Sequence, residues 1–452
     1  DSAAVVDGAG HILAEAFADD AAVRAAVRSL TWEQGLFTSL AARGKAEQVT
    51  KYEMYYDYKE SLKDVPSHRM LAMRRGEKEE VLRLAVVAPG DEILVSLEGR
   101  FVAADSTYKQ FLSDVVKDAY KRLLAPSIEV ELRLQSKQLA DHTAIAVFAE
   151  NLRNLLLAAP AGGRRVLGID PGLRTGSKLA VVEQTGQFNA HATIYPHTGS
   201  GKLESARTSF LDMVNAHQIE MVAVGNGTAG REMEQFSRQT LKDCGLKVPV
   251  IMVSESGASV YSASDIARED FPDLDLTIRG AISIARRLQD PQAELVNLDP
   301  KSIGVGQYQH DVSQPSLKKA LDEVVESCVN YDGVDLNTAS WSLLSFVSGI
   351  GETLARSIVN YRDQNGPFQS RRDLLGVPRF GQKAFEQAAG FLRIRQGCNP
   401  LDNTAVHPER YPLVERMASD AGTTLASFLA DHALIDRLKL DRYLDSEVGL
   451  PT

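Results

Sequence analysis

The chain has 452 residues, of which 44% are hydrophobic and 24% are charged, and its formal net charge is −10. These fractions are close to the averages of folded globular proteins, which excludes the disordered and fibrous classes, and the length predicts several domains. The acidic balance excludes a uniformly basic surface, so any contacts with nucleic-acid phosphates must be concentrated in local patches.

The sequence also disfavours membrane-spanning proteins and proteins built around disulfides or zinc. No run of eighteen apolar residues occurs, so we expect no transmembrane helix and no membrane partner. Cys244, Cys328 and Cys398 lie far apart and form neither a zinc-spaced pair nor a disulfide framework. The chain starts at Asp1 without a signal pattern, and we expect a cytoplasmic protein and a fragment of a longer one.

Residues 1–160 are predicted to form a mostly helical scaffold. AAVRAAVRSLTWEQGLFTSL and FLSDVVKDAYKRLLAPSIEVELRLQ place apolar side chains three and four residues apart, as amphipathic helices do. Between them, KYEMYYDYKE (residues 51–60) sets four tyrosines beside lysines. Aromatic rings next to cations suit base stacking, and tyrosines of a core with solvated charges are the commoner alternative.

Residues 161–290 change to a pattern of strands. RVLGIDPGLRTGSKLAVVEQTGQ contains two β-rich runs joined by a glycine-rich turn, and FNAHATIYP follows as a third run. Helical and strand-like segments then alternate through EMVAVGNG and VPVIMVSE. Three antiparallel strands followed by βαβ units predict an α/β domain with a ribonuclease-H-like layout.

A group of acids in this domain is a candidate catalytic and metal site. Asp170 ends the first strand, at the sheet edge where α/β proteins bind ligands, which makes it the candidate metal ligand. Glu255 and Asp265 follow a later strand, but Asn226 stands where another acid would be needed. Phosphodiester cleavage on this fold requires two metals about 4 Å apart, held by three or four carboxylates. The missing charge makes two-metal catalysis doubtful.

Two other interpretations of these residues stay open. In the first, the three acids have a purely structural role: Asp170 caps its turn, and Glu255 and Asp265 are helix-terminal or surface charges. DPGLRTG also resembles the phosphate-binding hairpin of an actin-like or sugar-kinase ATPase, but no second phosphate loop is evident.

From about Thr277 the pattern is helical to the end, with no strand expected. WSLLSFVSGIGETLARSIVNYR is typical of a helix-hairpin-helix motif, in which Gly349 and Gly351 let the backbone approach a phosphate and Ile350 fills the core. The N–H groups at the start of the second helix, near Thr353, would face the anion, and Arg356 would add charge. Such a motif binds backbone phosphates and does not read bases.

A second copy follows about thirty residues later. RRDLLGVPRFGQKAFEQAAGFLRI places Gly381 at the second glycine position but Arg379 at the first, with Lys383 nearby. Residues 330–396 contain eight Lys and Arg against six Asp and Glu, which makes this part mildly basic. The alternative is a pair of ordinary helical hairpins whose glycines only end helices.

Several segments together resemble the Tex family of bacterial transcription accessory proteins. The resemblance rests on sequences such as VPSHRMLAMRRGEKEEVLRL, VLGIDPGLRTGSKLAVV, VAVGNGTAGRE, CVNYDGVDLNTAS and SGIGETLARSIVNYR. It implies a helical core, a YqgF domain related to junction resolvases, tandem helix-hairpin-helix motifs and a following OB-fold that binds RNA or DNA. We expect this OB-fold to be missing here.

These observations give one set of expectations. The fold is mainly α with one ribonuclease-H-like domain, divided into residues 1–160, 161–290, 291–396 and a helical segment at 397–452. The leading hypothesis is a monomeric, non-catalytic scaffold without a cofactor that binds RNA or DNA backbone and touches RNA polymerase. The alternatives are a Mg²⁺-dependent, structure-specific nuclease that uses the three acids, and a pure protein-interaction platform.

Overall fold

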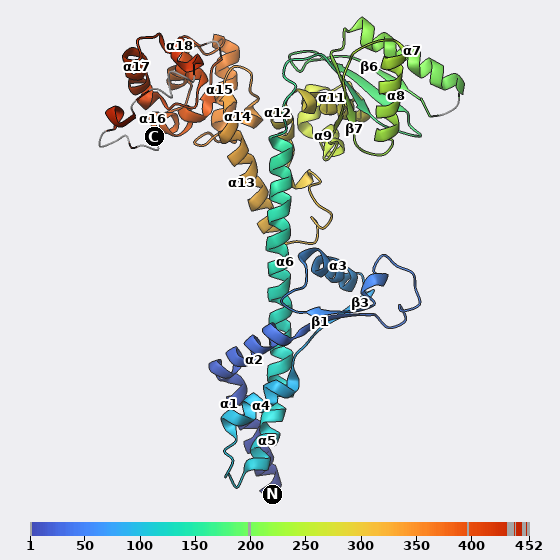
Figure 1. Cartoon of the computed structure of the whole chain (residues 1–452), viewed down its shortest axis with the longest axis vertical. Helices are drawn as coiled ribbons and strands as arrows, with labels where there is room; N and C mark the ends of the chain where they lie inside the picture. Colours follow the sequence, from blue (N-terminus) through green and yellow to red (C-terminus); the bar gives the residue numbers. More distant parts are fainter. Residues whose placement is uncertain are drawn as a thin grey trace. The chain divides into compact units, whose positions relative to one another are not determined.

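The computed structural model describes residues 2–197, 200–395, 397–431, 438, 440–444 and 449. The chain divides into two compact units, one made of Asp1–Phe148 with Gly306–Leu317 and one of Ala149–Val305 with Lys318–Thr452. Helix α6 (Ala125–Leu156) runs from the first unit into the second (Figure 1). None of the described helices is long and apolar enough to cross a membrane.

The first unit combines helices with a small antiparallel sheet. Its other helical segments are α1 (Ser2–Asp19), α2 (Ala21–Gln34), α3 (Ser67–Lys78), α4 (Gly90–Phe101), α5 (Lys109–Asp118), the 3₁₀ turn η1 (Glu53–Tyr55) and the π-helical turn η2 (Ala119–Leu124). The strands are β1 (Leu36–Ala41), β2 (Asp57–Ser61) and β3 (Leu82–Val87), in the order β2-β1-β3.

The first unit is mostly helical, as predicted, but it also contains a three-stranded sheet that the sequence patterns did not indicate. The predicted helix over LTWEQGLFTSL is interrupted at Gly35, where the backbone becomes extended, and Phe37 and Ser39 then alternate inward along β1. A six-residue strand shows too few repeats to be distinguished from the end of a helix. Two of the four tyrosines in residues 51–60 are core residues, since Tyr52 and Tyr55 are only 4% and 8% exposed, whereas Tyr56 and Tyr58 are half-buried.

The α/β domain has the predicted layout, an antiparallel meander of three strands followed by βαβ units. Its strands β4 (Val166–Asp170), β5 (Ser177–Val182), β6 (Phe188–Ile194), β7 (Met221–Gly225) and β8 (Val250–Val253) have the order β6-β5-β4-β7-β8. The pairs among β4, β5 and β6 are antiparallel, while β7 is parallel to both β4 and β8.

Helices cover both faces of this sheet (Figure 1). They are α7 (Ser200–Ala216), α8 (Gly230–Asp243), α9 (Ala258–Ala263), α10 (Asp265–Asp270) and α11 (Leu276–Gln289). Phe210 and Met233 of α7 and α8 fill one core, and Ala281 and Ile282 of α11 fill the other. Gly168 allows α11 to lie against β4, because a Cβ there would sit 2.2 Å from the Ala281 carbonyl oxygen.

The rest of the chain is a series of helices, most of them short. These are α12 (Pro291–Leu295), η3 (Pro300–Ser302), α13 (Gln314–Asp332), α14 (Trp341–Leu344), α15 (Glu352–Asn365), η4 (Arg371–Gly376), α16 (Gln382–Ala388), η5 (Ala389–Phe391), η6 (Pro400–Asn403), η7 (Pro408–Arg410), α17 (Tyr411–Asp420), α18 (Leu425–Ala430) and η8 (Leu440–Tyr443). One parallel pair, β9 (Val334–Asp335) with β10 (Leu392–Arg393), corrects the expectation that this part has no strand.

Candidate nucleic-acid interface and the acidic pair

The first hairpin, between α14 and α15, has the geometry that its glycines predict. Gly349 has a φ of +82°, in the left-handed region that favours glycine. The Ile350 N–H donates to the Val347 carbonyl at 2.9 Å, and the Ile350 side chain is 3% exposed. Gly351 then precedes α15 with a φ of −86°, and no side chain caps this helix start.

The start of α15 is open to an anion. Gly351, Glu352 and Thr353 are exposed, and a Cβ built on Gly351 would meet nothing within 4 Å. The first N–H groups of a helix have no partner within the helix and carry the positive end of its dipole. An exposed, uncapped start without a Cβ therefore lets a phosphate reach these groups.

The second hairpin repeats this backbone in spite of its different sequence. Arg379 occupies the place of Gly349 and adopts a φ of +68°. The Phe380 N–H donates to the Val377 carbonyl at 3.0 Å, as Ile350 does to Val347 in the first copy, and Phe380 is 4% exposed. Gly381 precedes α16 with a φ of −89° and no side-chain cap, again with no obstacle to a Cβ.

Sequence reasoning missed a residue that holds the first hairpin in place. Asn330, near the end of α13, donates through Nδ2 to the Phe346 carbonyl at 3.1 Å, and its Oδ1 accepts the Ser348 N–H at 3.0 Å. The same Nδ2 donates to the Glu326 carbonyl at 2.7 Å. A lone asparagine at the end of a helix gives no signal in the sequence of such a role.

The basic excess of this region is only partly available at the surface. Arg362 donates through Nη1 to the carbonyls of Leu336 and Ala339, at 2.9 and 3.0 Å. Arg371, 0% exposed, donates to three backbone carbonyls and a tyrosine hydroxyl. Arg393 donates to two carbonyls of its own turn. These three cations therefore serve the fold and contribute less to a phosphate-binding surface.

The cations that remain free gather at the second hairpin. Arg372, Arg379 and Lys383 are exposed and form no ion pair with another described residue. At the first hairpin, Arg356 pairs with Glu352 at 3.0 Å and lies over the Trp341 ring, 3.6 Å from its centroid. The first copy thus offers an open backbone, and the second adds unpaired positive charge.

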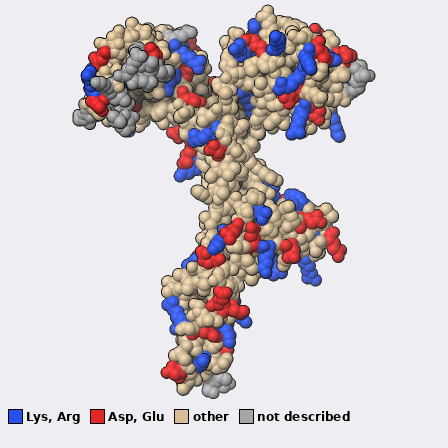
Figure 2. All heavy atoms as spheres, in the orientation of Figure 1, with Lys and Arg blue, Asp and Glu red and all other residues tan. Residues whose placement is uncertain are grey.

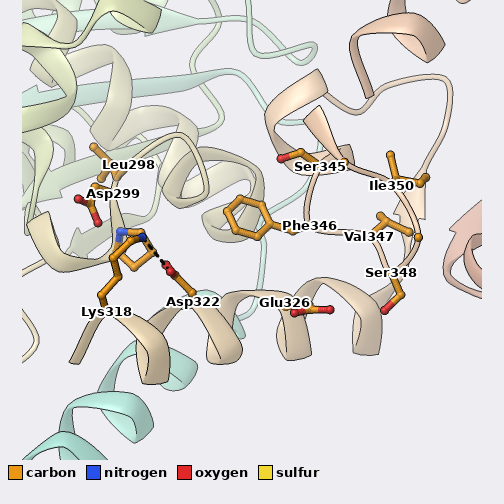
Figure 3. Close-up of a pocket in the computed structure, with 13 residues that line it drawn as sticks. Leu298, Asp299, Lys318, Asp322, Glu326, Ser345, Phe346, Val347, Ser348 and Ile350 are labelled. Carbon is orange, nitrogen blue, oxygen red and sulfur yellow. Dashed lines mark hydrogen bonds and ion pairs between the residues drawn. The ribbon is translucent and has the colours of Figure 1, made fainter. Parts of the chain in front are cut away.

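The first hairpin also borders an acidic groove, whose lining includes Gly349, Ile350 and Gly351. A groove of about 660 Å³ separates α13 from residues 345–351, and Figure 3 shows the Phe346 ring standing in it. Asp299 and Glu326 line this groove, while Asp322 pairs with Lys318 at 2.8 Å. Carboxylates repel phosphate, so a nucleic acid would approach from the helix starts. On the face shown in Figure 2, acidic and basic side chains are likewise interspersed.

Two acids of the α/β domain lie close enough to influence each other. Burial and then the charge of Glu255 raise the pKa of Asp170 to about 6, while Lys178, its partner across β4 and β5, acts in the opposite direction. Gly280 of α11 makes room for this carboxylate, because a Cβ there would lie 2.8 Å from Asp170 Oδ2.

The structure does not bring Asp265 or Asn226 to this pair as ligands. The Asp265 side chain is 89% exposed and pairs with Arg268 at 3.2 Å, at the start of α10. Asn226 Oδ1 accepts the Glu255 N–H at 3.1 Å and so joins the ends of β7 and β8. Among the described residues, no three His, Cys, Asp or Glu are placed to hold a metal. The residues therefore do not fit a two-metal centre.

The fold and site define a multidomain protein with a ribonuclease-H-like domain and tandem helix-hairpin-helix motifs. Family models agree: residues 164–289 match the Tex protein YqgF-like domain, and residues 1–148 match the Tex central region. Residues 329–393 match a helix-hairpin-helix motif and residues 399–452 match a helix-hairpin-helix domain. The chain belongs to the Tex family.

Individual relatives agree with this assignment. Protein YhgF of Escherichia coli is 48% identical over 467 residues, and the transcriptional accessory protein Tex of Neisseria gonorrhoeae is 45% identical over 461 residues. Each match covers 100% of this chain and 60% of the relative. The human S1 RNA-binding domain-containing protein 1 is 35% identical over 482 residues, which cover 92% of this chain and 48% of that protein. The chain thus spans about 60% of the length of these bacterial relatives.

The match at residues 399–452 was not anticipated from the sequence, in which this part showed short helices and no chemistry. Helices α17 and α18 lie in it, whereas residues 432–437, 439, 445–448 and 450–452 are outside the described residues. The sequence of residues 399–452 contains no glycine-centred hairpin as recognisable as SGIG, so it gave no signal of this domain.

Proposed function

We propose that this chain is a nucleic-acid-binding scaffold of the transcription machinery that holds the backbone of RNA or DNA. One observation carries the proposal: both hairpins present an exposed, uncapped helix start behind a glycine, with the same backbone geometry. Paired phosphate-binding elements suit a chain that follows the backbone and does not select a sequence.

The two hairpins contribute differently to the binding of the nucleic-acid backbone. At the first, the N–H groups that follow Gly351 bind one phosphate. At the second, Arg372, Arg379 and Lys383 add long-range attraction to the N–H groups that follow Gly381. Local charge of this kind reconciles phosphate binding with a net charge of −10.

The names of two relatives support the biological setting. One is called a transcriptional accessory protein, and another carries an S1 RNA-binding domain in its name. We extend the transcriptional role to this chain, with RNA or DNA as ligand and RNA polymerase as the protein partner. We also propose that it acts as a monomer in the cytoplasm.

We propose further that the YqgF-like domain acts without hydrolysis and requires no cofactor. Asp170 and Glu255 supply two carboxylates, whereas the amide oxygen of Asn226 is engaged by the Glu255 backbone and Asp265 points to solvent. The competing nuclease would require Mg²⁺ and would be lost on Asp170→Asn.

The test uses two substitutions that the fold tolerates but a bound phosphate would not. Gly351→Ala and Gly381→Ala each place a Cβ in open space, at a φ that alanine adopts freely. Gly8→Ala, also without a neighbour within 4 Å, is the matched control. Binding to single- and double-stranded RNA and DNA is measured by fluorescence anisotropy at several salt concentrations, and the Mg²⁺-containing samples are run on a denaturing gel.

We expect wild-type affinity to fall with salt, by a slope of about −0.9 per duplex DNA phosphate contacted. Each hairpin variant should lose on the order of tenfold in affinity while its melting curve stays close to that of the wild type. Unchanged affinity in both hairpin variants would refute the scaffold proposal in favour of a protein-interaction platform. Strands cut by the wild type but not by Asp170→Asn would establish the nuclease.

A further inference from the structure

A pocket lies beside the first hairpin and has no part in the phosphate binding proposed above. It is a pocket of about 370 Å³ where the end of α13 meets the turn after α16, lined by Tyr331, Phe391, Arg393 and His407, among others. We name it the Tyr331 pocket. Its volume falls in the range of small-ligand sites, and its lining combines aromatic rings with nitrogen donors.

The side chain of Tyr331 is largely exposed to solvent. Its exposed fraction is 79%, whereas the four tyrosines of the first unit that were candidates for base stacking are buried (Tyr52, Tyr55) or half-buried (Tyr56, Tyr58). An exposed aromatic ring alone carries no meaning, since single apolar side chains are common on surfaces. Here the ring borders a pocket that also contains Phe391, so that a planar ligand would have an aromatic face to lie on.

The polar groups of the pocket are held in fixed positions. Arg393 Nη1 donates to the Gly390 carbonyl at 2.7 Å, and its guanidinium lies against Gly333, where a Cβ would be 2.6 Å from Arg393 Cζ. His407 Nε2 lies 3.0 Å from the Glu386 carbonyl, to which it donates. Groups fixed before binding lose little entropy when a ligand arrives.

The pocket is coupled to the first hairpin by two residues that line it. Asn330, adjacent to Tyr331, binds the hairpin backbone at Phe346 and Ser348. Gln387 packs against the hairpin glycine, since a Cβ on Gly349 would lie 2.7 Å from Gln387 Cβ. The pocket and the first hairpin are therefore adjacent, because Asn330 and Gln387 line the one and contact the other.

We propose that the Tyr331 pocket binds an unpaired nucleobase of a single strand, which stacks on Tyr331 while the adjacent phosphate is held by the first hairpin. The inference rests on the proposed function and specifies its substrate. A base inside a duplex cannot offer its face to a side chain, so the pocket distinguishes single strands from duplexes. An aromatic surface with a fixed guanidinium favours a flat, polar-edged ring over an aliphatic peptide side chain.

The experiment compares three variants of the full chain. Tyr331→Ala removes the ring, Tyr331→Phe keeps it, and Tyr108→Ala removes a tyrosine of the first unit that is 70% exposed and serves as the matched control. Affinities are measured for a single strand, for a duplex of the same length, and for single strands that carry one abasic position at a time.

We expect Tyr331→Ala to weaken single-strand binding on the order of tenfold, with little change for the duplex, Tyr331→Phe or Tyr108→Ala. One abasic position should weaken the wild type similarly and leave Tyr331→Ala without further loss. Equal affinities of Tyr331→Ala and wild type would overturn the proposal and leave the pocket to a protein partner. Equal losses on duplex and single strand would also overturn it. If the hairpins do not bind phosphate, the proposed function fails instead, and this is recognised by unchanged duplex binding in Gly351→Ala and Gly381→Ala.

Discussion

Arg379 destabilises the fold through its backbone conformation and supplies a positive charge for nucleic-acid binding. Its φ of +68° is a conformation that costs a side-chain-bearing residue about 1–2 kcal/mol relative to glycine. Its guanidinium is exposed and unpaired among the described residues, at the mouth of the second hairpin. The strained backbone thus presents a positive charge where the first hairpin has only Gly349.

Replacing this residue should separate the two effects. Arg379→Gly is expected to raise the free energy of unfolding by about 0.5–1 kcal/mol, after the greater chain entropy of unfolded glycine is deducted. The same change should weaken nucleic-acid binding and reduce the salt slope by about one unit. Arg379→Gln, which keeps the strained φ but removes the charge, should show only the loss of binding. Urea denaturation and anisotropy measure both, and a destabilised glycine variant would contradict the account.

The raised pKa of Asp170 has a definite consequence for stability. The folded-state pKa of about 6 lies above the ordinary value of 3.8, so between these values the folded chain holds a proton that the unfolded chain has lost. Stability contributed by the neutral carboxyl is therefore complete below about pH 4 and is lost as pH rises through about 6.

Asp170→Asn should remove this penalty because its amide stays neutral. We expect the second unit to gain about 2–3 kcal/mol at pH 7.5 and close to nothing at pH 3.5. Asp265→Asn, at an 89% exposed side chain, should show no such dependence and serves as control. Denaturation curves at the two pH values provide the measurement, and a gain of equal size at both would show that titration is not the cause.

At the scale of elements, the first hairpin depends on contacts with the neighbouring helices α13 and α16. The first hairpin is held by Asn330, which lies in α13, and by the packing of Gln387 from α16 on Gly349. The short pair of β9 with β10 joins the segments that follow α13 and α16. The two copies therefore form one packed element.

Loss of the Asn330 amide should loosen the first hairpin without removing its core. Asn330→Ala leaves the Phe346 carbonyl and the Ser348 N–H without their partner, at a cost of about 1–3 kcal/mol. We expect faster amide hydrogen exchange at Ile350 and weaker nucleic-acid binding. Asn330→Asp, which retains an acceptor for Ser348, should be milder. Unchanged exchange at Ile350 in the alanine variant would argue that Ile350 alone fixes the turn.

At the scale of the whole molecule, the chain has two units with separate cores, joined through the continuous helix α6. Phe37, 0% exposed, lies in the sheet of the first unit, and Ile169, also 0% exposed, lies in the sheet of the second. Separate cores predict separate cooperative transitions.

Calorimetry of two core variants would test this division. Phe37→Ala should destabilise the first unit by about 3–5 kcal/mol and lower one transition, leaving duplex affinity at 25 °C unchanged because both hairpins belong to the other unit. Ile169→Ala should lower the other transition. A single transition that moves in both variants would show that α6 couples the units into one folding body.

Much of the fold could be predicted from the sequence because the signals are local. The β4, β5 and β6 runs alternate with turn residues, and helices α7 and α8, which precede and follow β7, have their own periodicity. The sheet of the first unit was missed because β1 and β2 are short and their partners lie about twenty and forty-five residues away. Pairing over such distances leaves little trace in a local pattern.

The sequence by itself determined the two hairpins and their glycine positions, because only certain residues permit a left-handed φ or a close phosphate approach. Tertiary structure alone decided which charges are available. Arg362, Arg371 and Arg393 turn inward to backbone carbonyls, whereas Arg372, Arg379 and Lys383 face solvent. It also separated Asp265 from Asp170 and placed Tyr331 beside a pocket. A long side chain is directed by acceptors that other segments supply, and those segments meet only in the folded chain.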